Sequence, residues 1–241
     1  MTERFNLIKN EGPEVEKRVL PRFPFNFLSF KGQGKEGDRV YEVRDISYRG
    51  MQLVLKDGKQ PYESGEMING TLIWRGKRLE LAAEVKWVKE KSLGVVFDST
   101  NGIGKKIRDF LSLDNIIAGM RPLHHGPLDL DLPTDLKYWL RAAGPVEIFV
   151  WQHKDGDLSR FQMILLDKFI EWEDGKGVKT GRLLKHRDID TPLTHNDEFL
   201  FEIDTNPDLE TVQFARSIVA KVPHSSLPDA ACSFLSLKLA L

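Results

Sequence analysis

Short segments of alternating apolar and polar residues fill the first half of the chain. Six of them have the length and pattern of β-strands, at residues 23–30, 39–47, 51–55, 66–74, 78–88 and 92–97. The Asp57-Gly58 pair and the Arg-Gly-Lys sequence at 75–77 are typical of the turns between such strands. Six short strands with these connections favour a small antiparallel barrel or sandwich over a layered α/β fold.

The pattern changes to a helical period after residue 100. Ile103, Ile107 and either Phe110 or Leu111 fall on one face of a predicted helix, which closes the first domain near residue 115. The predicted organisation is a mobile arm at 1–13, a β-rich domain with a terminal helix at 14–115, a proline-containing linker at 116–130 and a second domain at 131–241.

The second domain alternates between helical and strand patterns. Thr134 as N-cap and Gly144 as terminator predict a helix at its start. Four strand-like segments follow, at residues 146–152, 160–173, 177–185 and 198–204. A helix capped by Asn206, with Pro207 in its first position, and a last helix from about Ser226 complete an α+β domain.

Charge is distributed unevenly between the two halves of the chain. The net charge of the 241 residues is −1, which argues against a protein devoted to DNA or RNA. Residues 15–115 contain 19 Lys and Arg against 14 Asp and Glu, whereas residues 116–241 contain 14 against 19. The local charges are therefore +5 and −5, and an anionic ligand is expected in the first half.

The cysteine count and the apolar segments predict a cytoplasmic protein. Cys232 is the single cysteine, which excludes an internal disulfide and a cysteine-based zinc cluster and fits a reducing compartment. The N-terminal residues lack the apolar core of a signal peptide, and no segment approaches the ~18 apolar residues of a membrane span.

Polar residues at two places in the first half suit an anionic ligand with guanine edges. Arg18 and Arg22 precede the first strand, and Pro21 between them predicts a loop. Two guanidinium groups suit phosphate oxygens, and they can also contact or stack on guanine. Asp45 accepts hydrogen bonds from the N1 and N2 edge of guanine, Ser47 donates or accepts, and Gly50 permits a close backbone approach.

These residues resemble the signature of the PilZ domains, bacterial receptors for cyclic di-GMP. That signature is R-x-x-x-R followed by [D/N]-x-S-x-x-G, and the chain has it as Arg18 to Arg22 and Asp45 to Gly50. The resemblance extends over residues 14–115 and implies a six-stranded antiparallel barrel covered on one face by the arginine loop. It also implies that Arg18 and Arg22 grip the ligand while Asp45, Ser47 and Gly50 form the floor of the site. Lys17, just before the first arginine, is assigned to a second, stacked nucleotide.

The resemblance predicts a receptor and not an enzyme, with cyclic di-GMP as its ligand and no cofactor or metal. Ligand contact would order residues 1–22 and reposition the second domain for a protein partner that the sequence does not identify. One alternative is a PilZ-like scaffold that binds a protein partner without nucleotide. Another is an enzyme with its active site in residues 131–241, although those residues offer no defensible cluster of acids and bases.

Overall fold

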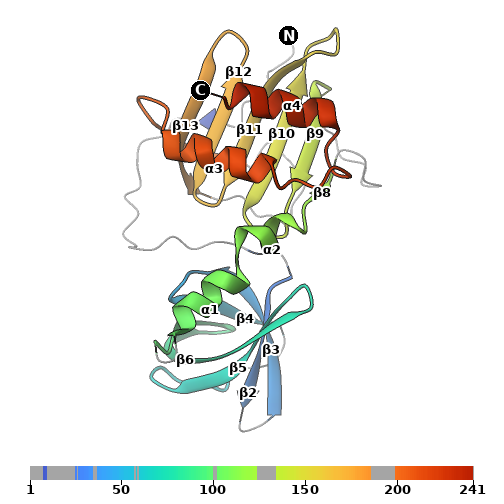
Figure 1. Cartoon of the computed structure of the whole chain (residues 1–241). Coiled ribbons are helices and arrows are strands. Elements are labelled where there is room, and N and C mark those ends of the chain that lie inside the picture. The colour runs from blue at the N-terminus through green and yellow to red at the C-terminus, as the bar shows by residue number, and fades with distance from the viewer. Residues whose placement is uncertain are drawn as a thin grey trace. The chain divides into compact units, whose positions relative to one another are not determined.

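The structure is a computed structural model of the whole chain (Figure 1). The residues described are 8–9, 25, 27–34, 37–56, 58, 60–99, 102–123, 134–185 and 199–240. The chain folds as two compact units. One consists of Arg18–Ser112, and the other combines Met1–Lys17 with Leu113–Leu241.

The first unit is a closed, antiparallel six-stranded barrel followed by a helix, which confirms the fold predicted for this part of the chain. Around the barrel the strand order is β2-β3-β4-β7-β6-β5. The strands are β2 (Ser29–Gly34), β3 (Gly37–Ile46), β4 (Gly50–Leu55), β5 (Met67–Trp74), β6 (Lys77–Lys89) and β7 (Ser92–Phe97). Closure pairs both edges of the sheet, so the barrel exposes no edge strand.

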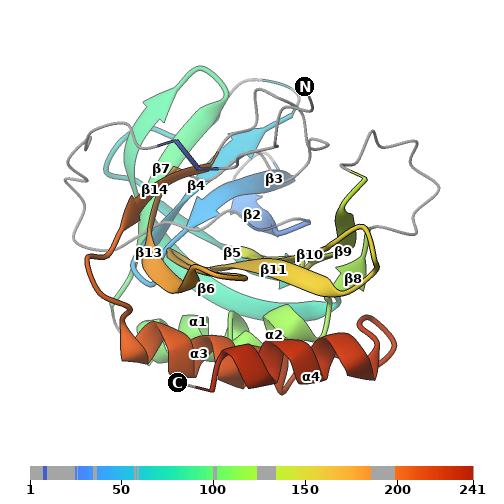
Figure 2. The same cartoon turned by 90° about the horizontal axis from the view of Figure 1, so that it is seen from above.

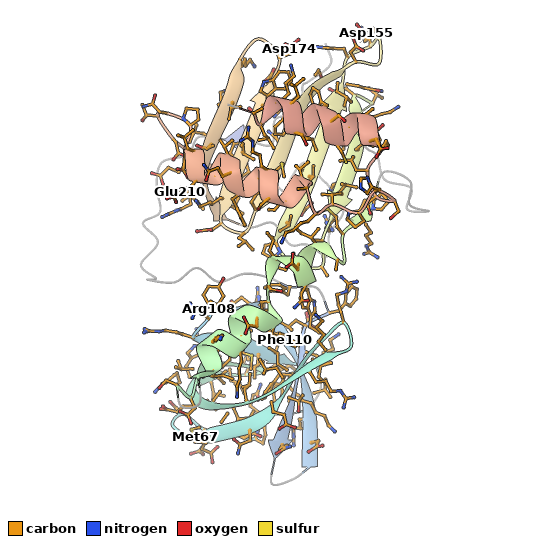
Figure 3. All side chains as sticks on the ribbon, in the orientation of Figure 1. Met67, Arg108, Phe110, Asp155, Asp174 and Glu210 are labelled. Carbon is orange, nitrogen blue, oxygen red and sulfur yellow. The ribbon has the colours of Figure 1, made fainter. Side chains whose placement is uncertain are left out.

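Large apolar side chains fill the barrel, and a helix packs against it. Phe30, Tyr41 and Leu53 are fully buried in the interior. Helix α1 (Ile103–Phe110) buries Ile103, Ile107 and Phe110, as its sequence period predicts. The Phe110 ring lies 6.3 Å from that of Trp74 at the end of β5 (Figure 3). This apolar face holds α1 on the barrel.

The start of the barrel differs from the predicted strand at residues 23–30. Strand β2 begins at Ser29, and Phe27 lies in a turn with a φ of 59°. Phe25, Leu28 and Phe30 are all buried, and the three-residue step from Phe25 to Leu28 breaks the two-residue repeat of a strand. The turn at Phe27 absorbs this change of phase and leaves its ring exposed.

The second unit is an eight-stranded sheet with two helices on one face (Figure 2). The strand order is β1-β14-β13-β12-β11-β10-β9-β8. The strands are β1 (Ile8–Lys9), β8 (Arg121–Pro122), β9 (Leu136–Arg141), β10 (Val146–Gln152), β11 (Leu158–Leu165), β12 (Lys168–Glu173), β13 (Gly177–Lys185) and β14 (Phe199–Ile203). The helices are α2 (Leu113–Ile117), α3 (Leu209–Val219) and α4 (Asp229–Lys238). Helices α3 and α4 cover the sheet, and all pairings are antiparallel except that of β1 with β14.

The helix predicted from Thr134 to Gly144 is wrong, because these residues contain strand β9. Tyr138, Trp139 and Leu140 are aromatic or bulky residues that pair with β10 in register. The Trp139 ring stacks on Phe149 at 5.7 Å. Packing against the neighbouring strand therefore overrides the local cap and stop signals.

Both C-terminal helices begin later than predicted. Asp208, and not Asn206, caps α3, because its side chain accepts hydrogen bonds from the backbone N–H groups of Glu210 and Thr211. The Thr211 hydroxyl also donates to Asp208 at 2.6 Å, and these bonds hold the pKa of Asp208 below its ordinary value. Helix α4 begins at Asp229, after the proline at 228.

The domain boundaries predicted from the sequence remain predictions, and the structure divides the chain slightly differently. Ile8 and Lys9, in the predicted arm, pair with Phe199 and Leu200 of the second unit. The second unit resumes at Leu113, and α2 and β8 occupy part of the predicted linker. Among the described residues, no helix has both the length and the apolar character required to cross a membrane.

Candidate ligand site on the barrel

The residues from Asp45 to Gly50 form the end of β3, a tight turn and the start of β4. The Ser47 N–H donates to the Gly50 carbonyl at 2.8 Å, and the Ser47 hydroxyl donates to the same oxygen at 3.2 Å. The same hydroxyl accepts from the Arg49 N–H at 3.3 Å. Ser47 is buried. Its hydroxyl therefore holds the turn in shape, a role that the sequence did not indicate.

Asp45 lies on the outer wall of the barrel. It pairs with Gln52 of β4, and the residues on either side of Gln52, Met51 and Leu53, are fully buried. Side chains alternate between the two faces of a strand and paired residues share a face, so Gln52 and Asp45 both face outward. A bulge between Val43 and Asp45 sets this direction by adding one residue, Arg44, to the strand.

Gly50 is required by the barrel itself. A Cβ atom at this position would lie 2.2 Å from the carbonyl oxygen of Val95 on the neighbouring strand β7. No side chain fits there without moving the β7 backbone. The close backbone approach expected at Gly50 thus occurs between two strands.

The row that contains Asp45 continues across the barrel to a tryptophan. Gln52 pairs with Gly94 of β7, and Gly94 pairs with Trp87 of β6. The Trp87 indole lies directly on Gly94, where a Cβ atom would be 2.1 Å from its Nε1 atom. Asp45, Gln52, Gly94 and Trp87, here called the ligand wall, combine a carboxylate, an amide and a flat aromatic surface.

Gln52 and Trp87 were not predicted as site residues. The sequence places them in strand patterns that give no indication of a ligand. The signal that could have identified them is the outward-facing Gly94 opposite a tryptophan, and this signal depends on the strand register. A second bulge, between Val85 and Trp87, shifts that register by one residue.

Two exposed arginines and a helix surround the turn. Arg44 and Arg49 are exposed. The Arg108 guanidinium of α1 lies over the Tyr48 ring, 5.9 Å from its centroid (Figure 3). These cations give the wall a positively charged border that suits an anionic ligand.

The arginine part of the predicted site, Lys17, Arg18 and Arg22, lies outside the described residues. The structure therefore brings Asp45, Ser47 and Gly50 together in one turn and its flanking strands, and leaves the assignment of Lys17, Arg18 and Arg22 as a prediction. The boundary between the two units falls between Lys17 and Arg18.

Buried charges in the second unit form structural pairs. Phe161 of β11 and Trp172 of β12 contact Phe234 of α4, so both face the side of the sheet that the helices cover. The residues that alternate with them along the strands face the other side. There Glu147 accepts from Trp139 Nε1 at 2.9 Å and pairs with Arg141 at 3.4 Å. Burial raises the pKa of Glu147.

A second pair on this face joins Arg160 to Glu171 at 2.6 Å, and Gln162 also donates to that carboxylate. The described residues contain no group of three or more His, Cys, Asp or Glu side chains placed to hold a metal ion. Each of the two carboxylates thus has a cationic partner within the sheet, and these two pairs are not the convergent set of acids and bases that the enzyme alternative requires.

Comparisons with known proteins bear on the first unit. Residues 16–112 match the family model of the PilZ domain. The solved PilZ domain of YcgR from Escherichia coli with c-di-GMP is 11% identical, with a TM-score of 0.36, over 39% of this chain and 88% of that one. The MrkH–c-di-GMP complex of K. pneumonia is 19% identical, with a TM-score of 0.34, over 40% of this chain and 52% of that one. A search of curated proteins finds no match.

Proposed function

We propose that this chain, whose residues 16–112 match the family model of the PilZ domain, is a receptor for cyclic di-GMP. The observation that carries the proposal is the placement of Asp45. It faces outward beside Gln52 and the Trp87 indole, inside a domain that also carries the two-arginine motif. A carboxylate, an amide and an aromatic plane suit the edge and the face of guanine.

In the proposed complex, Arg18 and Arg22 contact the phosphates and a guanine, and Asp45 accepts hydrogen bonds from the guanine N1 and N2 groups. Ser47 and Gly50 act through the turn, since the hydroxyl of Ser47 is engaged inside it and Gly50 lies against β7. Lys17 is assigned to a second, stacked nucleotide. The chain needs no catalysis for this role.

The proposed consequence of binding is a change in how residues 1–22 are held. The unit boundary lies between Lys17 and Arg18, and β1 at Ile8–Lys9 belongs to the sheet of the second unit. A ligand that fixes Arg18 and Arg22 on the barrel thus acts on the segment that joins the two units. This supports the proposal that occupancy is transmitted to the second unit and from there to a protein partner.

Calorimetric titration of the full chain with cyclic di-GMP tests the receptor role. Each of Arg18→Ala and Arg22→Ala is expected to weaken binding about 10- to 100-fold, because each removes a charged hydrogen-bond contact worth roughly 1.5 to 3 kcal/mol. The double variant is expected to show no measurable heat. Arg182→Ala/Arg216→Ala, two exposed arginines of β13 and α3, is the matched control and should bind as the wild type does.

The competing scaffold function predicts a different result. If the wild-type chain is folded and releases no heat with cyclic di-GMP, the receptor proposal is wrong and a nucleotide-independent protein contact is favoured. If the control variant loses as much affinity as the motif variant, binding depends on general positive charge and the motif assignment fails.

A further inference from the structure

Phe27 combines an exposed ring with a backbone conformation that phenylalanine rarely adopts. Its φ is 59°, and 80% of the residue is exposed. A bulky residue in the left-handed region destabilises the folded state by roughly 1 kcal/mol or more, and burial of an exposed ring offsets little of this loss. The conformation of Phe27 therefore lowers the stability of the folded chain without an evident gain for the barrel.

Two buried neighbours impose this conformation. Phe25 packs edge-on against Trp74, with 5.3 Å between the ring centroids. Leu28 is 1% exposed, and its carbonyl accepts a hydrogen bond from the Val43 N–H at 3.0 Å. With both ends of the short segment anchored inward, the ring of Phe27 is directed out into solvent.

The register of β2 and β3 places Phe27 beside the ligand wall. Ser29 pairs with Glu42, and the Leu28–Val43 hydrogen bond extends the ladder by one step. Beyond this hydrogen bond, the next residue on the first segment is Phe27, and the next on β3 is Arg44, the bulge residue directly before Asp45. The chain order around the barrel thus puts Phe27 at the β2 end of the wall, whose opposite, β6 end is the Trp87 indole.

We infer that Phe27 is a base-stacking residue of this site, an inference that rests on the proposed cyclic di-GMP function. The ligand carries two guanines, and the wall between Asp45 and Trp87 offers an edge and a plane to one of them. Phe27, five residues after Arg22, presents a second plane for the other base. Stacking on aromatic rings is sequence-tolerant and requires an exposed face, which a ring held out by a strained backbone supplies.

The charges around Phe27 favour a nucleotide over an apolar protein surface as its occupant. Arg44 next to it is exposed, and the motif arginines precede it closely in the chain. A cation beside an aromatic ring suits an anionic ligand with planar bases. Two other exposed apolar residues of the barrel, Val40 and Met67, pair with Lys31 and Glu84 and not with residues of the wall.

The test compares ring removal with ring replacement in the full chain, by calorimetry with cyclic di-GMP and by thermal unfolding. Phe27→Asn removes the ring and tolerates the left-handed backbone, so we expect an unchanged or higher Tm with about 5- to 100-fold weaker binding. Phe27→Trp should retain the wild-type affinity. Val40→Asn, at a residue of β3 that is 61% exposed, is the control and should change neither binding nor folding.

The possible results distinguish the stacking role of Phe27 from the receptor function and from a structural role of the ring. If the wild type binds and Phe27→Asn binds equally well, the stacking role is wrong while the receptor function stands. A wild type that does not bind overturns both. If Phe27→Asn lowers Tm strongly, Phe27→Gly provides the second measurement, and a loss of stability in both variants identifies the ring as structural and contradicts the inference.

Discussion

Asp45, Ser47 and Gly50 belong to one motif but have different physical roles. The Ser47 hydroxyl makes two hydrogen bonds within its own turn, and Gly50 lies against the Val95 carbonyl. Of the three, Asp45 alone has its side chain on the outer wall. At the scale of single residues, the motif therefore divides into two positions that build the surface and one, Asp45, for which ligand contact is proposed.

Two outward-facing glycines of the barrel, Gly50 and Gly94, provide a matched pair for this distinction. A methyl group at Gly50 meets the backbone of β7, whereas one at Gly94 meets the indole of Trp87, which can rotate away. We expect Gly50→Ala to lower the free energy of unfolding by several kcal/mol, on the order of the largest single-site effects. Gly94→Ala is expected to lower it less and to change the tryptophan emission.

Chemical denaturation monitored by fluorescence and circular dichroism measures both effects. Gly94→Ala should also weaken cyclic di-GMP binding, because the displaced indole disturbs the ligand wall. Equal stability of the two variants would show that β7 relaxes around Gly50, and the structural role given to this glycine would then be wrong.

Individual elements show what the sequence could and could not predict. The six barrel strands and α1 follow from alternation and a clear apolar stripe, both of which are local signals. Strand β9 was mistaken for a helix because Thr134 and Gly144 supply cap and stop signals, whereas the decisive pairing with β10 is a contact that the local pattern does not contain. The positions of Gln52 and Trp87 in the row depend on two bulges, and the register that a bulge produces is decided by pairing with the neighbouring strand.

The N-terminus of α3 allows the observed cap to be tested against the predicted one. Asp208→Ala removes the acceptor of the Glu210 and Thr211 N–H groups and should lower the Tm of the second unit. Asn206→Ala, at the residue first expected to cap this helix, should leave Tm unchanged. Thermal unfolding followed by circular dichroism measures both, and equal effects of the two substitutions would contradict the assignment.

The same cap has a defined pH dependence. The folded-state pKa of Asp208 lies below the ordinary value of 3.8, so its contribution to stability is present above that value and is lost as the pH falls through the folded pKa. The Tm difference between wild type and Asp208→Ala should therefore be constant near neutrality and shrink at strongly acidic pH. A difference that grows on acidification would contradict this.

At the scale of the whole molecule, the chain passes between the two units twice. It crosses at Lys17–Arg18, beside the arginine motif, and at Ser112–Leu113, after α1. The first crossing follows β1, whose partner β14 belongs to the second sheet. In the proposed receptor, the chain between the arginines and β1 would therefore provide a covalent route for the signal to the edge of that sheet.

Hydrogen exchange on the full chain tests this route. Cyclic di-GMP is expected to change amide exchange in β14 as well as in the barrel, since fixing Arg18 and Arg22 alters the segment that leads to β1. Arg18→Ala/Arg22→Ala should abolish both changes. Protection confined to the barrel in the wild type would contradict transmission through β1 while leaving ligand binding intact.

The parallel pairing of β1 with β14 also makes the second unit discontinuous, with the barrel inserted between its first strand and the remainder. Pairing β1 with β14 brings together the two ends of a chain segment that contains the entire barrel, and so closes a loop. The entropy lost on closing a loop grows with its number of freely moving residues. When the barrel is folded, most residues of this loop do not move freely, so the entropy cost of pairing β1 with β14 is small. Unfolding of the barrel would raise that entropy cost and weaken the pairing of β1. The two units should therefore show coupled unfolding although each has its own core.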